Sequence, residues 1–161
     1  MIYNQKRHIE LLKRSQDLKN QRKNLFIENQ EEDLELSKYN TIVAEYIFWQ
    51  DRDQVALLME DFLNKKIDGE EFCGQIYGLR RKLINTCEKF KLELISSSEK
   101  IQDFQPDGKA KKLSGFLTGL FCECDHFMEN YENDEFYTSI KTGFLNFQKA
   151  LNEEWEAISL F

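Results

Sequence analysis

Only one proline, Pro106, and seven glycines interrupt the 161 residues of this chain. An all-β fold needs a turn every ten residues or so, and such turns rely on glycine and proline, so this scarcity argues against it. Apolar residues instead recur every three or four positions, which is the spacing of a helix face. We therefore expect an all-α fold. The longest run of this kind comprises Phe72, Ile76, Leu79, Leu83, Cys87, Phe90 and Leu94.

Helical spacing dominates the chain beyond residue 50. The first predicted helix runs from Asp51 to about Lys66, where cations suit a helix C-terminus. Asp68 predicts the N-cap of the second helix, because Glu71 three residues later completes a capping box. Gly74 and Gly78 in that helix predict a close crossing with a neighbouring helix. These signals place two helices before the single proline.

A long polar loop is expected over Ser96–Lys112, followed by two further helices. They are expected to begin at about Ser114 and, after a cap, at Asn133. The four helices predict an antiparallel four-helix bundle and one acidic domain over residues 51–161. Its predicted core residues in the last two helices are Leu117, Leu120, Phe121, Cys124, Met128, Tyr137, Ile140, Phe144, Phe147, Leu151, Trp155 and Ile158.

Residues 1–50 are predicted to form a separate region, a basic arm with a linking helix. Residues 1–24 contain few apolar positions, so we expect an exposed helix or arm. The acidic cluster Glu28–Glu35 is interpreted as a connection. Tyr39–Trp49 has helical spacing, but its β-branched and aromatic content leaves a strand possible. This segment is expected to pack on the side of the bundle.

The net charge of −7 and the pI of about 5.0 conceal an asymmetry. Residues 1–24 carry +5, because seven basic residues face only Glu10 and Asp17. The remainder is strongly acidic, which disfavours nucleic acid and anionic membranes as partners and favours basic proteins. Contact with nucleic acid is open only to the basic arm, which lacks interleaved aromatic residues. The basic residues of the arm are Lys6, Arg7, Lys13, Arg14, Lys19, Arg22 and Lys23.

The four cysteines follow no secretory signal, so we expect free thiols in a reducing compartment, either the cytoplasm or an organelle interior. Cys122 and Cys124 would point about 200° apart on a helix and cannot share a metal ion. Cys122 and His126 share a face but supply only two of the usual four ligands. No phosphate-binding loop, nucleophile elbow or catalytic triad is present, so we expect no cofactor, no metal and no enzymatic activity. The abundant Asn, Lys, Ile and Phe suggest an A+T-rich bacterial or organelle genome.

The stretch Leu58–Phe72, LMEDFLNKKIDGEEF, resembles the opening of small colicin-like immunity domains of the colicin D type. In that family, as here, a helix ends in Phe-Leu, and a short turn supplies a capping residue before Glu-Glu-Phe. A second helix then begins, here continuing through Leu79. The runs Leu117–His126 and Asn133–Trp155 resemble the family's third and fourth helices. The resemblance covers about residues 54–155.

The resemblance implies a non-catalytic module that neutralises a tRNase toxin by filling its basic substrate cleft with acidic side chains. Charge complementarity of this kind steers association between proteins. About fifty residues ahead of the matching region, including the basic arm, depart from the family's pattern. The residues that would bind the toxin are Glu123, Asp125, Glu129, Glu132, Asp134 and Glu135.

A second hypothesis assigns the chain to a different class of protein. It would be an accessory structural subunit that docks on a large assembly, such as a ribonucleoprotein, through its N-terminal region and Tyr39–Trp49. Removal of residues 1–50 should then abolish binding, whereas charge reversal of the acidic residues should matter little. The two hypotheses therefore place the partner on different parts of the molecule.

Overall fold

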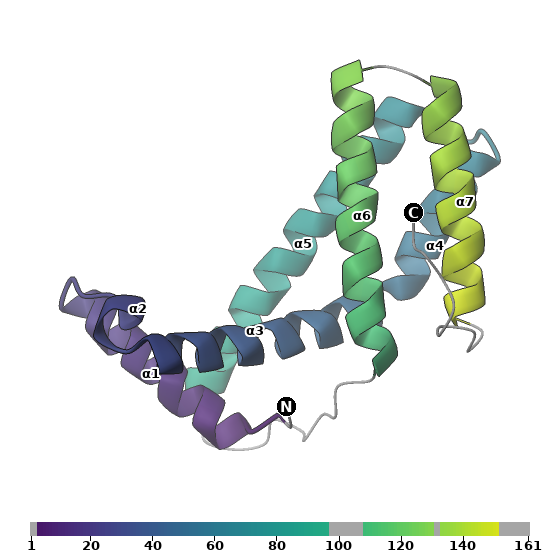
Figure 1. The fold of residues 1–161 in the computed structure, drawn as a ribbon. Coiled ribbons are helices and arrows are strands. Elements are labelled where there is room, and N and C mark those ends of the chain that lie inside the picture. Colours follow the sequence, from purple (N-terminus) through teal and green to yellow (C-terminus); the bar gives the residue numbers. More distant parts are fainter. Residues whose placement is uncertain (1–2, 97–107, 131–132, 152–161) are drawn as a thin grey trace.

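The computed structural model describes residues 3–96, 108–130 and 133–151, and every regular element in these ranges is a helix. The prediction of an all-α fold is confirmed. Tyr39–Trp49 lies within a helix, not a strand. The helices in Figure 1 are α1 (Gln5–Asn20), α2 (Leu25–Glu28), α3 (Gln30–Gln50), α4 (Arg52–Leu63), α5 (Gly69–Ser96), α6 (Gly108–Asn130) and α7 (Asn133–Leu151).

The main hydrophobic core lies among α3 to α7, which we call the body. The rings of Phe62 and Phe72 stack near one end of this core, with centroids 4.9 Å apart. Helix α4 packs against α5 and α7, and α6 packs against the same two helices. Helix α3 also crosses α5 and α6 and adds Val43 and Ile47 to the core. A bundle of four helices alone is therefore not confirmed, because α3 packs on α5 and α6 and contributes to the same core.

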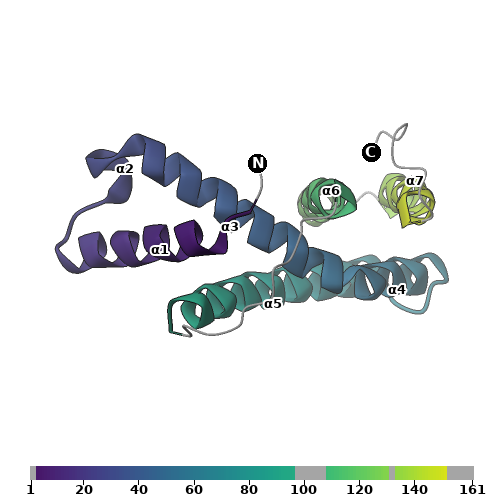
Figure 2. The same ribbon diagram turned by 90° about the horizontal axis from the view of Figure 1, so that it is seen from below.

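The first three helices form a hairpin with a small core of its own. Figure 2 shows α1 lying along the first half of α3, with the four-residue α2 at the far end. Helices α1 and α2 and the first half of α3 extend away from α4, α6 and α7 (Figure 1). The prediction of an exposed arm is therefore wrong in part, because α1 is helical but buries His8 and Leu11 against its neighbours. The small core consists of Leu11, Leu25, Leu36, Tyr39 and Ile42.

The acidic cluster Glu28–Glu35 is a helix start and not the predicted connection. Asn29 caps α3, because its side-chain oxygen accepts a hydrogen bond from the Glu32 amide at 3.2 Å. The first turn of α3 contains Glu31, Glu32 and Asp33. Carboxylates in a first turn interact favourably with the helix dipole. The same residues that suggested a polar linker therefore stabilise the beginning of a helix.

The start of α6 also differs from the prediction. The helix begins at Gly108, one and a half turns before Ser114, and Ala110 and Leu113 are buried on it. The end of the predicted Ser96–Lys112 loop is thus helical. Its middle, residues 97–107, lies outside the described residues. Three lysines among the apolar residues conceal the helical face in this stretch.

Helix α5 carries the long apolar face that the sequence predicts. The Asp68 Oδ1 atom accepts a hydrogen bond from the Glu71 amide at 2.8 Å, which confirms the predicted N-cap. Every residue of the face is buried except Phe90, which is partly buried. The close crossing predicted at Gly74 and Gly78 is wrong. Both glycines are exposed, and a Cβ atom on either would meet open space.

The predicted core of α6 and α7 is confirmed with one exception. Met128 is 38% exposed, and its neighbour Phe127, at 4% exposed, occupies the core position. Trp155 and Ile158 lie outside the described residues. Tyr137, Phe144 and Leu151 are partly buried. The predicted residues that are buried are Leu117, Leu120, Phe121, Cys124, Ile140 and Phe147.

Gly69 brings the start of α5 directly against α6. A Cβ atom at this position would lie 2.5 Å from the Cζ atom of Phe127, which is closer than side chains approach. The Phe127 ring is itself stacked on Phe136 with centroids 4.4 Å apart. The ring therefore has little room to move away. Only glycine allows these two helices to meet as closely as they do.

Gly69→Ala is expected to lower the free energy of unfolding by about 1–3 kcal/mol, because the added methyl group overpacks the core. Gly74→Ala and Gly78→Ala are matched controls on the same helix. Each is expected to raise that free energy by about 0.5–1 kcal/mol, because alanine is the better helix former and nothing obstructs it. Urea unfolding measures all three values. Destabilisation by either control would show that α5 packs against another element there.

Candidate functional site

Four helix ends meet at one end of the body, and exposed carboxylates gather there. The C-terminus of α6 and the N-terminus of α7 lie beside the turn between α4 and α5 (Figure 1). The sequence contains no lysine or arginine from Leu113 to Ile140, whereas the α4–α5 turn contributes the exposed Lys65 and Lys66. We call this surface the acidic end. Its exposed carboxylates belong to Glu70, Glu71, Glu129, Asp134 and Glu135.

Two of the predicted binding residues point to opposite sides of α6. The Ser139 hydroxyl donates to Glu123 Oε2 at 2.7 Å on the side of α7. The Tyr77 hydroxyl donates to Asp125 Oδ1 at 2.7 Å on the side of α5. Burial, and then Asp125, raise the pKa of the Tyr77 phenol, so it remains a donor. These two carboxylates hold α6 to its neighbours and do not form one surface.

The remaining predicted acids have a different placement. Glu129, Asp134 and Glu135 lie at the acidic end, and Glu132 lies outside the described residues. Glu70 and Glu71 join them from α5, and sequence reasoning missed both as binding residues. Their position in the first turn of a capped helix was a visible signal, but nothing in the sequence linked that turn to α7. The fold brings the two helix starts together.

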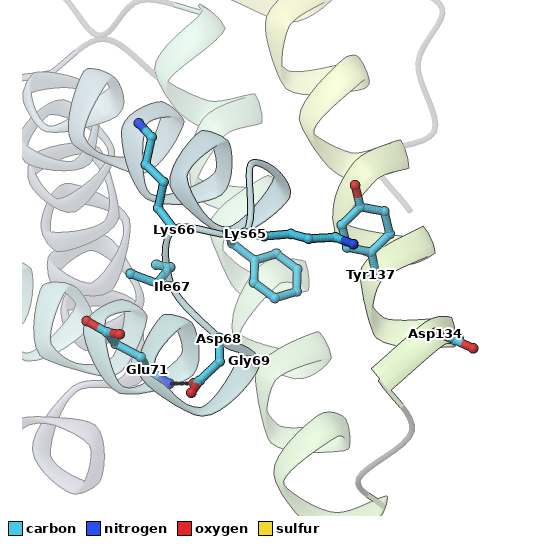
Figure 3. A pocket seen from close by; sticks show the side chains of 9 residues that line it. Lys65, Lys66, Ile67, Asp68, Gly69, Glu71, Asp134 and Tyr137 are labelled. Atoms are coloured by element: carbon cyan, nitrogen blue, oxygen red, sulfur yellow. Dashed lines mark hydrogen bonds between the residues drawn. The ribbon is translucent and has the colours of Figure 1, made fainter.

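A pocket of about 700 Å³ opens between the α4–α5 turn and the start of α7. The Tyr137 hydroxyl donates to the Leu63 carbonyl oxygen at 3.2 Å, which fixes the aromatic ring on one wall. Figure 3 shows that the carboxylates of Glu71 and Asp134 point away from each other. The Asp68 carboxylate is occupied in capping α5. The carboxylates around this pocket therefore do not converge on one point.

A second pocket, of about 510 Å³, lies along one face of α7. Its lining contains two carboxylates, three hydroxyl-bearing side chains and no basic residue. The hydroxyls of Thr138 and Thr142 donate to backbone carbonyl oxygens one turn earlier, at 2.9 and 3.0 Å. Ser139 donates to Glu123. The carboxylates of Asp134 and Glu135 are therefore the charged groups that a ligand in this pocket would meet.

Helix α6 arranges its charges against its own dipole. Its first turn contains no acidic residue and its last turn contains no basic residue. Lys109 and Lys111 lie near its start, and Glu129 lies in its last turn. A basic residue near the start of a helix, or an acidic residue at its end, lowers the stability of that helix by about 0.3–1 kcal/mol. Helix stability accounts for the acids that begin α5 and α7, but it does not account for Glu129.

The predicted basic arm is largely neutralised by α3. Arg7 Nη2 lies 2.9 Å from Glu35 Oε2, and Arg14 Nε lies 3.0 Å from Glu32 Oε2. The hydrogen bond from Arg7 holds the pKa of the Glu35 carboxyl below its usual range. Residues 1–50 contain eight basic and eight acidic side chains, so their charges cancel. The other basic residues of the arm, all exposed, are Lys6, Lys13, Lys19, Arg22 and Lys23.

The four cysteines divide into one exposed and three buried thiols. Cys122 is exposed, whereas Cys73, Cys87 and Cys124 are buried. The Cys73 thiol donates to the Cys124 carbonyl oxygen at 3.9 Å. Hydrogen bonding with Cys73, and then burial, raise the pKa of the Cys124 thiol, and burial raises that of Cys87. Among the described residues, no group of three or more His, Cys, Asp or Glu is arranged to hold a metal ion.

Comparisons with protein-family models, with curated proteins and with solved structures give no match to the chain. The resemblance to colicin D-type immunity domains therefore rests on the sequence motifs and stays a prediction. None of the helices in the described ranges has a stretch long and apolar enough to cross a bilayer.

The native protein is expected to react rapidly with one equivalent of the thiol reagent DTNB, at Cys122. The three buried thiols should react at least about a hundredfold more slowly, because the fold must first open to expose them. Absorbance of the released thionitrobenzoate follows both phases. Cys122→Ser should lose the rapid phase, and all four thiols of the parent chain should react in denaturant. A rapid phase that survives in Cys122→Ser would contradict the burial of the other three.

Proposed function

We propose that the chain is a non-catalytic protein-binding module that inhibits a basic nuclease, of the tRNase toxin kind, in the manner of a bacteriocin immunity protein. The acidic end would occupy the substrate cleft of the nuclease. The observation that carries this proposal is the position of Glu129, in the last turn of α6. A residue that weakens its own helix, beside exposed acids from two other helices, is explained by a role in binding. Local rules of stability are commonly broken at functional sites.

The chemistry of an RNA-cleaving cleft suits this surface. Such a cleft is lined with arginine and lysine to hold phosphates. Carboxylates that meet these side chains form charge-assisted hydrogen bonds, which are bidentate for arginine. The pocket beside Asp134 and Glu135 is large enough for a basic side chain, and no lysine or arginine is among the described residues that line it. Association driven by such charges is fast and falls as salt rises.

Glu129→Lys separates the effects of this residue on stability and on binding. The substitution is expected to raise the free energy of unfolding by about 0.3–1 kcal/mol, because a cation suits the C-terminus of α6. It should weaken partner binding at least about tenfold, because it places like charges in contact. The partner is first retained from a native extract by the full chain at low salt and identified by mass spectrometry. Its affinity and the inhibition of its RNA cleavage are then measured with each variant.

Asp17→Lys is the matched control for this experiment. Asp17 is exposed in the last turn of α1, so its reversal makes the same change of charge in the last turn of a helix. It should stabilise the protein similarly and leave the affinity within about twofold. An equal loss of affinity in both variants would show that net charge, and not the acidic end, governs binding. A partner that does not cleave RNA would contradict the nuclease part of the proposal.

A second candidate function is docking on a large assembly through the hairpin, and one observation favours it. Phe26 and Ile27 of α2 are 52% and 80% exposed, and Leu34 near the start of α3 is 58% exposed. Leu25 between the hairpin helices is buried and holds α2 in place, so its neighbours are displayed from an ordered element. Exposed apolar side chains on a projecting element are typical of interaction sites.

Replacement of both Phe26 and Ile27 by serine distinguishes this candidate from the nuclease inhibitor. If the hairpin docks on an assembly, the double variant should no longer retain the assembly's subunits from an extract, whereas Glu129→Lys should still retain them. If the acidic end binds a nuclease, the reverse pattern is expected. The fold should be unaffected, because both side chains are exposed, and circular dichroism checks this. Mass spectrometry of the retained proteins gives the answer for each variant.

A further inference from the structure

His8 is completely buried at the interface that attaches α1 to α3. Its Nε2 atom lies 3.1 Å from Asn40 Oδ1, and its Nδ1 atom lies 3.0 Å from the Tyr3 hydroxyl oxygen. Its ring stacks on Tyr39, with centroids 5.4 Å apart and planes inclined by 27°. Because Asn40 Oδ1 can only accept, Nε2 carries a hydrogen. Burial favours the neutral imidazole over the charged one, and in the neutral form Nδ1 accepts from the Tyr3 hydroxyl.

The surroundings of His8 do not compensate for an added proton. The charged side chain that acts on His8 directly is Lys91 on α5, which is itself paired with Glu88 at 2.7 Å. Arg7 on α1 and Glu35 on α3 lie beside Tyr39, the ring stacked on His8. Glu35 is already paired with Arg7, and Lys91 repels a positive charge on the imidazole. Burial is the main cause of the lowered pKa of His8, Lys91 adds to it, and the hydrogen bond with Asn40 opposes it. Protonation would also require the Tyr3 hydroxyl to turn from donor to acceptor.

The attachment of α1 combines a small apolar contact with the ion pairs that Arg7 and Arg14 make with α3. His8 and Leu11 are the buried side chains of this helix. The small core that they help to close is separate from the main core of the body. Segments with few buried apolar contacts can open while the rest of a protein stays folded. Release of α1 therefore does not require the body to unfold.

We propose that α1 is a pH-sensitive latch: a proton on the His8 imidazole releases α1 from α3 and α5 while the body stays folded. The released state binds this proton below about pH 6.5, the usual pKa of histidine, and the docked state binds it only at lower pH. Docking is thus complete above pH 6.5 and is weakened as the pH falls below that value. Release would expose Leu36, Tyr39 and Ile42 on α3, which the docked α1 covers.

Hydrogen exchange of the full chain between pH 5.0 and 7.5, corrected for intrinsic exchange rates, tests the latch. In this range the Arg7–Glu35 pair stays ionised, because Arg7 lowers the pKa of that carboxyl below its usual 4.5. Protection of residues 5–20 should fall up to about tenfold per pH unit below pH 6.5, as expected for one proton. Protection of α6 and α7 should not change. Constant protection of residues 5–20 would overturn the proposal.

Two variants assign the effect to His8. His8→Gln keeps a donor for Asn40 but cannot titrate, so the pH dependence of residues 5–20 should disappear. His126→Gln removes the exposed histidine of α6, and the pH dependence of residues 5–20 should remain in this variant. An unchanged pH dependence in His8→Gln would overturn the latch. If α1 is already released in His8→Gln, that variant cannot test the latch. An NMR titration of the His8 imidazole in the unsubstituted protein then tests it. An apparent pKa below 6.5 that coincides with exchange of residues 5–20 supports the latch, and one at or above 6.5 overturns it.

Discussion

Burial of α3 on two sides is the constraint on which the arrangement of the other helices depends. Its first half contributes Leu36, Tyr39 and Ile42 to the small core of the hairpin, and its second half contributes Val43 and Ile47 to the main core. Helix α3 packs against α1, α2, α4, α5 and α6, and α7 is held through α4 and α6. Each of these side chains stabilises the fold by about 1.5–3 kcal/mol when removed from water. The hairpin and the body are thus joined by packing as well as by the chain.

The same constraint explains which helices could be predicted. Helix α5 is buried along one face, so its stripe and the Asp68 cap were visible in the sequence. In α3, Ile42 faces the small core and its neighbour Val43 faces the main core, so no single stripe appears. A helix buried on two sides shows apolar residues all round and resembles a buried strand. The starts of α3 and α6 were missed because charged residues were interpreted as loop and not as helix ends.

The candidate site was predictable only where it is local in sequence. The run without lysine or arginine pointed to α6 and α7, and three of its acids lie at the acidic end. The hydrogen bond between Tyr77 and Asp125 joins residues 48 positions apart, and no local sequence pattern predicts it. Glu70 and Glu71 reach the same surface because Gly69 allows close contact with α6. The burial of His8 likewise depends on Asn40, which lies 32 residues further along the chain.

The continuity of α3 also has a mechanical consequence. Its 21 residues form a rod roughly 30 Å long at 1.5 Å per residue. One end of this rod supports α2, and the other crosses α6 within the body (Figure 2). A load applied at α2 is therefore not absorbed by a flexible linker. Such a load rotates α3 about its crossing with α6. Displacement of α2 is therefore accompanied by repacking of the main core around Val43 and Ile47.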